Sequence, residues 1–194
     1  DDAEGSWDFG SGAGIYVDAT EAPWDKHYQM YSYVTEELPT LISANFSTQN
    51  KASIFGHSMG GHGALICALN RPDQYRSASA FAPIVHPSAC PWGEKALGQY
   101  LGKNTDTWRR YDTCELVKTS GIPLPIQIDQ GLADNFLEEQ LRLEDLKSIA
   151  LATSATSANK LCIDEHQDYD HSYFFIASFI EKHLRFHAQH LKNN

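Results

Sequence analysis

The sequence predicts an α/β fold in which helices cover both faces of a mostly parallel sheet. Short apolar segments that alternate with helical segments support this prediction, because that order is typical of βαβ units. The apolar segments, each predicted to be a strand, span residues 51–56, 77–82, 125–129 and 160–164. With 194 residues, of which 42% are hydrophobic, the chain has the length and composition of a single globular domain over residues 1–194.

Four segments contain apolar residues that recur every three or four positions, which predicts helices. These segments span residues 27–46, 60–71, 135–151 and 171–191. Pro39 inside the first segment predicts a kink, and Pro72 ends the second. The residues of the last helix predicted to face the interior are Phe175, Phe179, Leu184 and Leu191. The stretch 83–124, which contains several Pro and Gly residues, predicts loops and short helices.

The composition excludes several classes of partner. The formal net charge of −10 disfavours binding to nucleic acid or to an anionic membrane surface. No apolar run has the length of a transmembrane helix. The four cysteines form no C-x-x-C pair, which predicts buried free thiols in a cytoplasmic protein and no zinc site. His183, His187 and His190 share helical spacing, but without an acidic third ligand they predict polar positions near a helix end.

The sharpest functional signal is Gly56-His57-Ser58-Met59-Gly60, a G-x-S-x-G motif between a predicted strand and a predicted helix. This context is typical of the nucleophile elbow of an α/β-hydrolase fold, in which the serine lies on a tight strand-to-helix turn. We therefore predict that Ser58 is the nucleophile. The Met59 N–H, at the start of the following helix, is the expected donor to a developing oxyanion.

A serine nucleophile needs a base and a carboxylate that orients the base, and in this fold the acid precedes the histidine in the sequence. Two candidate acids follow the third predicted strand. Asp129 lies at the strand end, where it would bond to loop backbone, whereas Asp134 lies far enough beyond to curl back toward the sheet. Asn135 and Glu138 predict a capping box, which would free Asp134 from capping the next helix. Asp134 is therefore preferred, and Asp129 is the alternative.

Two histidines follow the fourth predicted strand and could act as the base. His166 comes directly after the strand, where it could simply cap it, whereas His171 closes the loop just before the last helix. The order of triad residues in this fold favours His171. A triad of Ser58, Asp134 and His171 needs neither a metal ion nor an organic cofactor.

Four stretches carry a more specific resemblance: GHSMGGHGALICALNRPDQYRSASAFAPI, CPWGEKAL, DQGLADNF and YDHSYFFIASFIEKHLRFHA. They resemble the S-formylglutathione hydrolase family, also called esterase D. The resemblance runs from SWDFGSGAGIYVDAT to the end of the chain, and it implies a nucleophile at Ser58, an acid at Asp134 and a base at His171. It also implies that Trp92 lines the acyl or thiol pocket. The implied reaction is hydrolysis of S-formylglutathione to glutathione and formate, a step of formaldehyde detoxification, with side activity on small acyl esters.

The resemblance also implies a longer protein. Members of that family carry a further N-terminal stretch with the first strands of the sheet and the loop that donates a second oxyanion N–H. We therefore expect this chain to be the C-terminal two-thirds of the domain and to be unstable and inactive alone. The alternatives are a general carboxylesterase or acyltransferase of the same fold, and a non-catalytic fragment that lacks the oxyanion loop. The expected partner is a small thioester or ester, and a homodimer is one assembly that this sequence allows.

Overall fold

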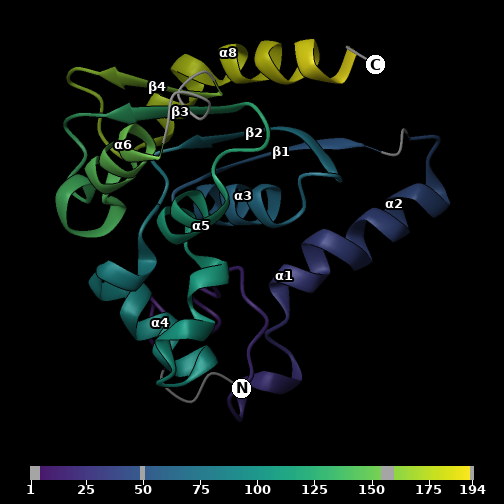
Figure 1. The fold of residues 1–194 in the computed structure, drawn as a ribbon, viewed down its shortest axis with the longest axis vertical. Coiled ribbons are helices and arrows are strands. Elements are labelled where there is room, and N and C mark those ends of the chain that lie inside the picture. The colour runs from purple at the N-terminus through teal and green to yellow at the C-terminus, as the bar shows by residue number, and fades with distance from the viewer. Residues whose placement is uncertain (1–4, 49–50, 154–159, 193–194) are drawn as a thin grey trace.

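Four parallel strands form the sheet of the protein, whose computed structural model describes residues 5–48, 51–153 and 160–192 (Figure 1). In their spatial order the strands are β1 (Ala52–His57), β2 (Tyr75–Phe81), β3 (Ile126–Gly131) and β4 (Leu161–His166). All four predicted strands are confirmed. His57, Phe81, Asp129 and Asp164 pair across neighbouring strands, so the carboxyl ends of all four strands meet at one edge of the sheet.

Helices cover both faces of this sheet, as predicted. The helix α3 (Met59–Asn70) packs on β1 and β2, and α8 (Tyr173–Lys192) packs on the same sheet. Figure 1 shows α8 on one side of the sheet and α3, with α5 (Thr113–Ser120), on the other. A further helix, α4 (Pro91–Leu101), lies in the segment 83–124, where loops and short helices are predicted. The residues of α3 from Gly61 to Leu69 are all buried, so this helix lies at the centre of the core.

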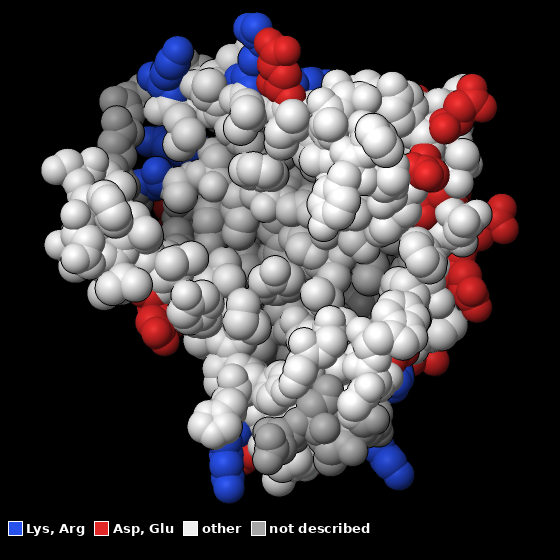
Figure 2. All heavy atoms as spheres, turned by 180° about the vertical axis from the view of Figure 1, so that it is seen from behind, with Lys and Arg blue, Asp and Glu red and all other residues white. Residues whose placement is uncertain are grey.

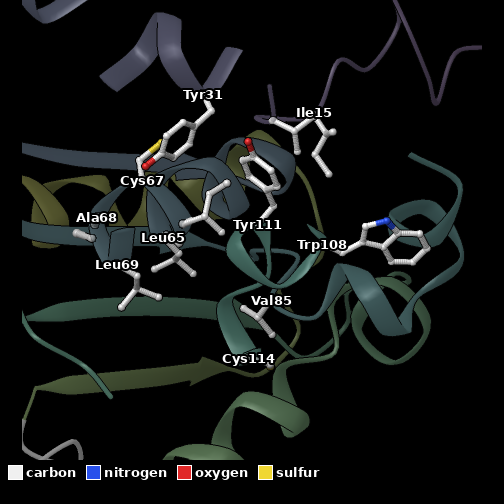
Figure 3. Close-up of a cluster of buried hydrophobic side chains, with 14 of the residues drawn as sticks. Ile15, Tyr31, Leu65, Cys67, Ala68, Leu69, Val85, Trp108, Tyr111 and Cys114 are labelled. Carbon is white, nitrogen blue, oxygen red and sulfur yellow. The ribbon is translucent and has the colours of Figure 1, made fainter. Parts of the chain in front are cut away.

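In the core around α3, side chains of the sheet layer pack against side chains of the segment that precedes β1. Figure 3 shows Leu65 and Cys67 of α3 in one cluster with Tyr31 and Tyr111, which come from distant parts of the sequence. The Tyr31 and Tyr111 rings lie edge to face, 5.7 Å between centroids. These contacts fix the N-terminal segment against the helix that follows the elbow, and thereby fix one wall of the cavity described below.

The helical segment predicted over residues 27–46 has an irregular turn near Pro39. It contains α1 (Met30–Ser32), a π-helical turn (Tyr33–Glu37) and α2 (Leu38–Asn45). Proline has no N–H to donate, and its ring crowds the preceding turn, so the widened turn relieves that conflict. Pro39 predicts a kink or a broken turn, and the structure has an irregular π-helical turn that ends two residues before it.

The single helix predicted over residues 135–151 is wrong. The structure has a π-helical turn (Leu137–Leu141), then Arg142 in the left-handed region with φ of 60°, and then α6 (Leu143–Ala152). The Leu141 carbonyl accepts a hydrogen bond from the Val85 N–H at 3.0 Å instead of continuing the helical ladder. Packing against this distant segment outweighs the local helical pattern.

The inward face of α8 also differs from the prediction. Phe175 is buried as expected, but Leu184 is 53% exposed, whereas His183 and His187 are buried. The two histidines bond to the hydroxyls of Ser77 and Ser79 on β2. The prediction of polar positions at a helix end was wrong for His183 and His187, because their polar partners lie in the sheet and are invisible in a periodicity pattern.

Two edge strands of the described sheet carry exposed side chains. Phe55 on β1 is 47% exposed, and Cys162 on β4 is exposed, whereas Cys67, Cys90 and Cys114 are buried free thiols. The prediction of a buried thiol was wrong for Cys162, because β4 is the outermost strand in the described order. The face seen in Figure 2 is hollowed at its centre, and the Lys, Arg, Asp and Glu side chains visible there lie mostly around its edge.

The burial of His187 predicts how stability depends on pH. Burial, with His183 and His190 nearby, lowers the pKa of His187 to about 4 from its usual 6.5. The unfolded chain therefore binds a proton at His187 more readily than the folded protein does. The contribution of His187 to the free energy of unfolding is complete above about pH 6.5, and it falls by roughly 3 kcal/mol as the pH drops to about 4. Urea unfolding of the protein and of His187→Asn at a series of pH values measures this difference. The variant should lose only part of the pH dependence of the free energy of unfolding. The rest remains because His57, whose pKa burial also lowers to about 4, still contributes to it.

The control for this prediction is His27→Asn, since His27 is exposed. The pH dependence of this control should match that of the unchanged protein. An equal pH dependence in His187→Asn and His27→Asn would contradict the account.

Candidate active site

Ser58 lies on a strained turn between β1 and α3. Its φ of 56° and ψ of −118° fall in a region that non-glycine residues rarely adopt. Its N–H donates to the Phe81 carbonyl at 2.8 Å, and its carbonyl accepts from the His62 N–H at 2.9 Å. A Cβ at Gly56 would overlap the Gly60 carbonyl, so the strand and the helix cross where only glycine fits. This is the backbone geometry of a nucleophile elbow.

Met59 is the first residue of α3. The N–H groups of the first turn of a helix have no acceptor within the helix. The Met59 N–H therefore lies beside Ser58 at the positive end of the helix dipole, where a negative charge is stabilised. That it donates to an oxyanion stays a prediction.

Asp134 and His171 form a short hydrogen bond, with 2.5 Å between Asp134 Oδ2 and His171 Nδ1. Asp134 is 6% exposed, and its other oxygen accepts from the Phe136 N–H at 2.9 Å. The inference that Asn135 would free Asp134 from the turn was therefore wrong, because Asp134 uses one oxygen for the turn and the other for the imidazole. The bond at Nδ1 leaves Nε2 as the ring nitrogen that can serve a nucleophile.

The alternative acid and the alternative base bond to each other instead. Asp129 is completely buried, and its Oδ1 lies 2.6 Å from His166 Nε2. The structure thus separates the two carboxylates that sequence position left as alternatives: Asp134 contacts His171, and Asp129 contacts His166.

Ser58 and His171 line one cavity of about 290 Å³. No hydrogen bond joins Ser58 and His171 in the described part of the chain. The hydrogen bond between a nucleophile and its base is often long in unliganded enzymes and shortens when substrate binds. The cavity wall is mostly apolar, and it also contains Met59, Ile84, Trp92 and Phe136. The Trp92 and Phe136 rings lie 5.0 Å apart, and the Phe136 ring lies 5.1 Å from that of His171.

His57 is a residue of this site that the sequence analysis left without a role. Its ring lies 4.4 Å from that of His171. Burial, with the neighbouring His171, lowers the pKa of His57 to about 4, so it is neutral near pH 7. The signal that could have identified it is its place inside the elbow motif, directly before Ser58. A neutral ring there packs against the proposed base without adding charge.

A search of the described residues finds no group of three or more His, Cys, Asp or Glu side chains arranged to hold a metal ion. In the same part of the chain, no helix is long and apolar enough to cross a membrane.

A parallel sheet with a strained serine between strand and helix, and a carboxylate–imidazole pair beyond the next strand ends, is an α/β-hydrolase fold. The chain belongs to the family described as "Putative esterase", whose model matches residues 1–186.

Several proteins that resemble this chain at 50% identity or more are named S-formylglutathione hydrolase. The chain is 55% identical over 188 residues to an S-formylglutathione hydrolase of Rattus norvegicus, covering 96% of this chain and 66% of the relative. It is 52% identical over 190 residues to one of Bos taurus, covering 97% of this chain and 66% of the relative. A solved structure of an S-formylglutathione hydrolase from Agrobacterium tumefaciens matches with a TM-score of 0.90 and 50% identity, covering 97% of this chain and 67% of that one. The chain thus spans 66% of the length of these curated relatives.

Proposed function

We propose that this chain carries the catalytic groups of a serine hydrolase that cleaves small thioesters and esters. The observation that supports this best is the 2.5 Å bond between Asp134 and His171, which leaves the other nitrogen of the imidazole free in the cavity that Ser58 lines. A carboxylate holds the imidazole in the tautomer that accepts a proton at Nε2 and stabilises the imidazolium once formed. Asp134 is the proposed acid, His171 the base and Ser58 the nucleophile.

The reaction follows from these positions. Ser58 Oγ attacks the acyl carbonyl as its proton passes to His171 Nε2, and the oxyanion accepts from the Met59 N–H. The carbon–sulfur bond then breaks, and the thiol leaves with the proton from His171. A water molecule gives a proton to the same nitrogen and attacks the acyl-enzyme, which releases the acid and restores Ser58. Each proton that His171 takes is returned, and neither a metal nor a cofactor is needed.

We propose S-formylglutathione as the preferred substrate. The relatives named above support this, since each bears the name S-formylglutathione hydrolase at 50–55% identity. The small apolar cavity is also compatible with a small acyl group, and we propose that Trp92 lines the acyl or thiol pocket within it. The alternative of a general carboxylesterase shares the triad and differs only in this pocket.

The substrate preference is tested by comparing kcat/KM for S-formylglutathione, p-nitrophenyl acetate and p-nitrophenyl butyrate with the protein at its full native length. We expect the value for S-formylglutathione to exceed that for butyrate by about 100-fold or more, because each additional methylene in a tight pocket changes discrimination by roughly 10–200-fold. Comparable values on butyrate would instead support the general carboxylesterase.

We further propose that residues 1–194 all belong to one domain, as its C-terminal two-thirds, and that the protein lies in the cytoplasm. The free thiols support a reducing compartment. Burial raises the pKa of Cys67 to about 12 and that of Cys90 to about 11, so both stay protonated and unreactive. A homodimer remains the assembly to test, and light scattering of the native protein measures it.

A further inference from the structure

Asp129 is a buried carboxylate to which the catalytic steps above assign no role. Its Oδ1 accepts hydrogen bonds from His166 at 2.6 Å and Lys182 at 2.8 Å, and its Oδ2 accepts from His183 at 2.8 Å and Lys182 at 2.9 Å. The Gln127 amide adds another donor at 3.0 Å. Burial alone would raise the pKa of Asp129, but the bonds from His183, Lys182 and His166 outweigh it and hold the pKa far below its usual value. A carboxylate with this many donors stays ionised and fixes all of them.

These donors lie at the two ends of the segment 166–183, which carries His171. His166 ends β4 at one end of that segment, and Lys182 and His183 belong to α8 at the other. A single carboxylate on β3 therefore holds the segment with His171 at its two ends. The His166 ring also stacks on Phe179 of α8, with 3.7 Å between centroids, which ties the two ends to each other.

The loop that carries Asp134 is attached to the same segment by its backbone. The Leu132 N–H donates to the His166 carbonyl and the Ala133 N–H to the Tyr169 carbonyl, each at 2.9 Å. A Cβ at Gly131 would overlap the Tyr169 carbonyl, so the two loops are in the closest backbone contact. Asp129 lies on the strand that leads into this loop. Its bond to His166 thus fixes the point from which both loops depart toward the Asp134–His171 bond.

A second layer of hydrogen bonds fixes the direction of His183. His183 Nδ1 lies 2.7 Å from Ser79 Oγ, and Ser79 Oγ lies 2.8 Å from His187 Nε2. His187 Nδ1 lies 2.8 Å from Ser77 Oγ. An ionised Asp129 only accepts, so His183 donates to it from Nε2. Burial lowers the pKa of His187 to about 4, so near pH 7 this ring is neutral and has one N–H to share between its two serine partners. The serine hydroxyls of β2 thus hold the His183 ring in place while it bonds to Asp129.

We propose that Asp129 is a positioning residue that sets the geometry of the Asp134–His171 pair by holding the His171 segment at both ends and against the Asp134 loop. This inference rests on the proposed function, because it assigns Asp129 a part in the same reaction. Asp129 is completely buried and is not among the described residues that line the cavity. It acts through His166 and α8.

Asp129→Asn tests this proposal. Asparagine keeps the size of the side chain but loses the charge, and its amide NH₂ group would face N–H donors that now bond to the carboxylate. We expect kcat for thioester hydrolysis to fall by about 10–100-fold, as is typical when a residue that orients a functional imidazole is changed. KM should change by less than about twofold, because the pocket wall is untouched. The short Asp134–His171 bond predicts a low-field proton resonance for the His171 Nδ1–H of the unchanged protein, and this resonance should shift or broaden in the variant.

The matched control is Asp145→Asn. Asp145 also bonds to an imidazole and a guanidinium, His86 at 2.8 Å and Arg142 at 2.9 Å, but not to either catalytic loop. This variant should be destabilised without loss of kcat or change in the His171 resonance. The variant His166→Asn, which removes only the link to β4, should lower kcat in the same way as Asp129→Asn and covers the case in which Asp129→Asn fails to fold.

The outcomes are distinguishable. No hydrolysis of any ester by the unchanged protein at its full native length would refute the proposed function, while the His171 resonance in the variants would still test the positioning. An active protein in which Asp129→Asn or His166→Asn keeps its kcat and its His171 resonance would overturn the inference. A fall in kcat of the same size in Asp145→Asn would also overturn it, because the effect would then be one of general stability.

Discussion

Replacement of Ser58 with alanine is expected to lower kcat by about 10⁴–10⁶-fold, with a folded protein and little change in KM. The reason is that, among the described residues that line the cavity, Ser58 is the one with a hydroxyl, and it lies on the strained turn at the start of α3, so the covalent step has no substitute there. Residual turnover would come from binding and the oxyanion donor alone. Single-turnover kinetics with a thioester, together with thermal unfolding of the variant, measure both parts of this prediction.

The control for Ser58→Ala is Ser178→Ala. Ser178 is an exposed serine on α8 whose hydroxyl donates to the Phe174 carbonyl at 2.9 Å. It should retain full activity. A Ser58→Ala protein with more than about 1% of the original kcat would mean that the nucleophile is another group.

Asp134→Asn is expected to lower kcat by about 10⁴-fold. The asparagine oxygen can still accept from the Phe136 N–H and keep the turn, but its amide group then faces His171 Nδ1. The imidazole would adopt the tautomer with its proton on Nε2, which cannot accept the proton of Ser58. The loss should therefore appear in kcat, with the fold and KM retained.

A direct comparison with Asp129→Asn tests the assignment of the acid. Asp134→Asn should lower kcat about 100–1,000 times more than Asp129→Asn, because Asp134 contacts the base and Asp129 acts at a distance. A larger loss in Asp129→Asn would reverse the two roles.

Sequence reasoning succeeded where a local pattern is enough. Apolar runs placed the four strands, and the elbow motif placed a turn whose glycines leave no room for side chains. The order of residues along the fold also selected Asp134 and His171, which the structure brings into contact. The strands and the elbow are features in which a short stretch of chain carries the whole constraint, whereas the Asp134–His171 pair follows from the order of elements in this fold.

The failures share a cause, since each depends on a partner far away in the sequence. Leu141 ends a helical turn because its carbonyl bonds to Val85. His183 and His187 are buried because they form hydrogen bonds with serines of β2 and, for His183, with Asp129 of β3. A helical pattern cannot predict these partners. His57 gains its place beside His171 only when the strands are assembled.

The measurement that tests the central claim most directly is the mass of the protein after reaction with a fluorophosphonate, which phosphonylates activated serines. We predict one adduct per chain, located by peptide mapping on Ser58 and prevented by an excess of a thioester substrate. Adduct formation should be much slower in Asp134→Asn and absent in Ser58→Ala. An adduct on a different residue, or an unmodified Ser58 in a protein that still hydrolyses thioesters, would contradict the assignment of Ser58, Asp134 and His171 as the catalytic groups.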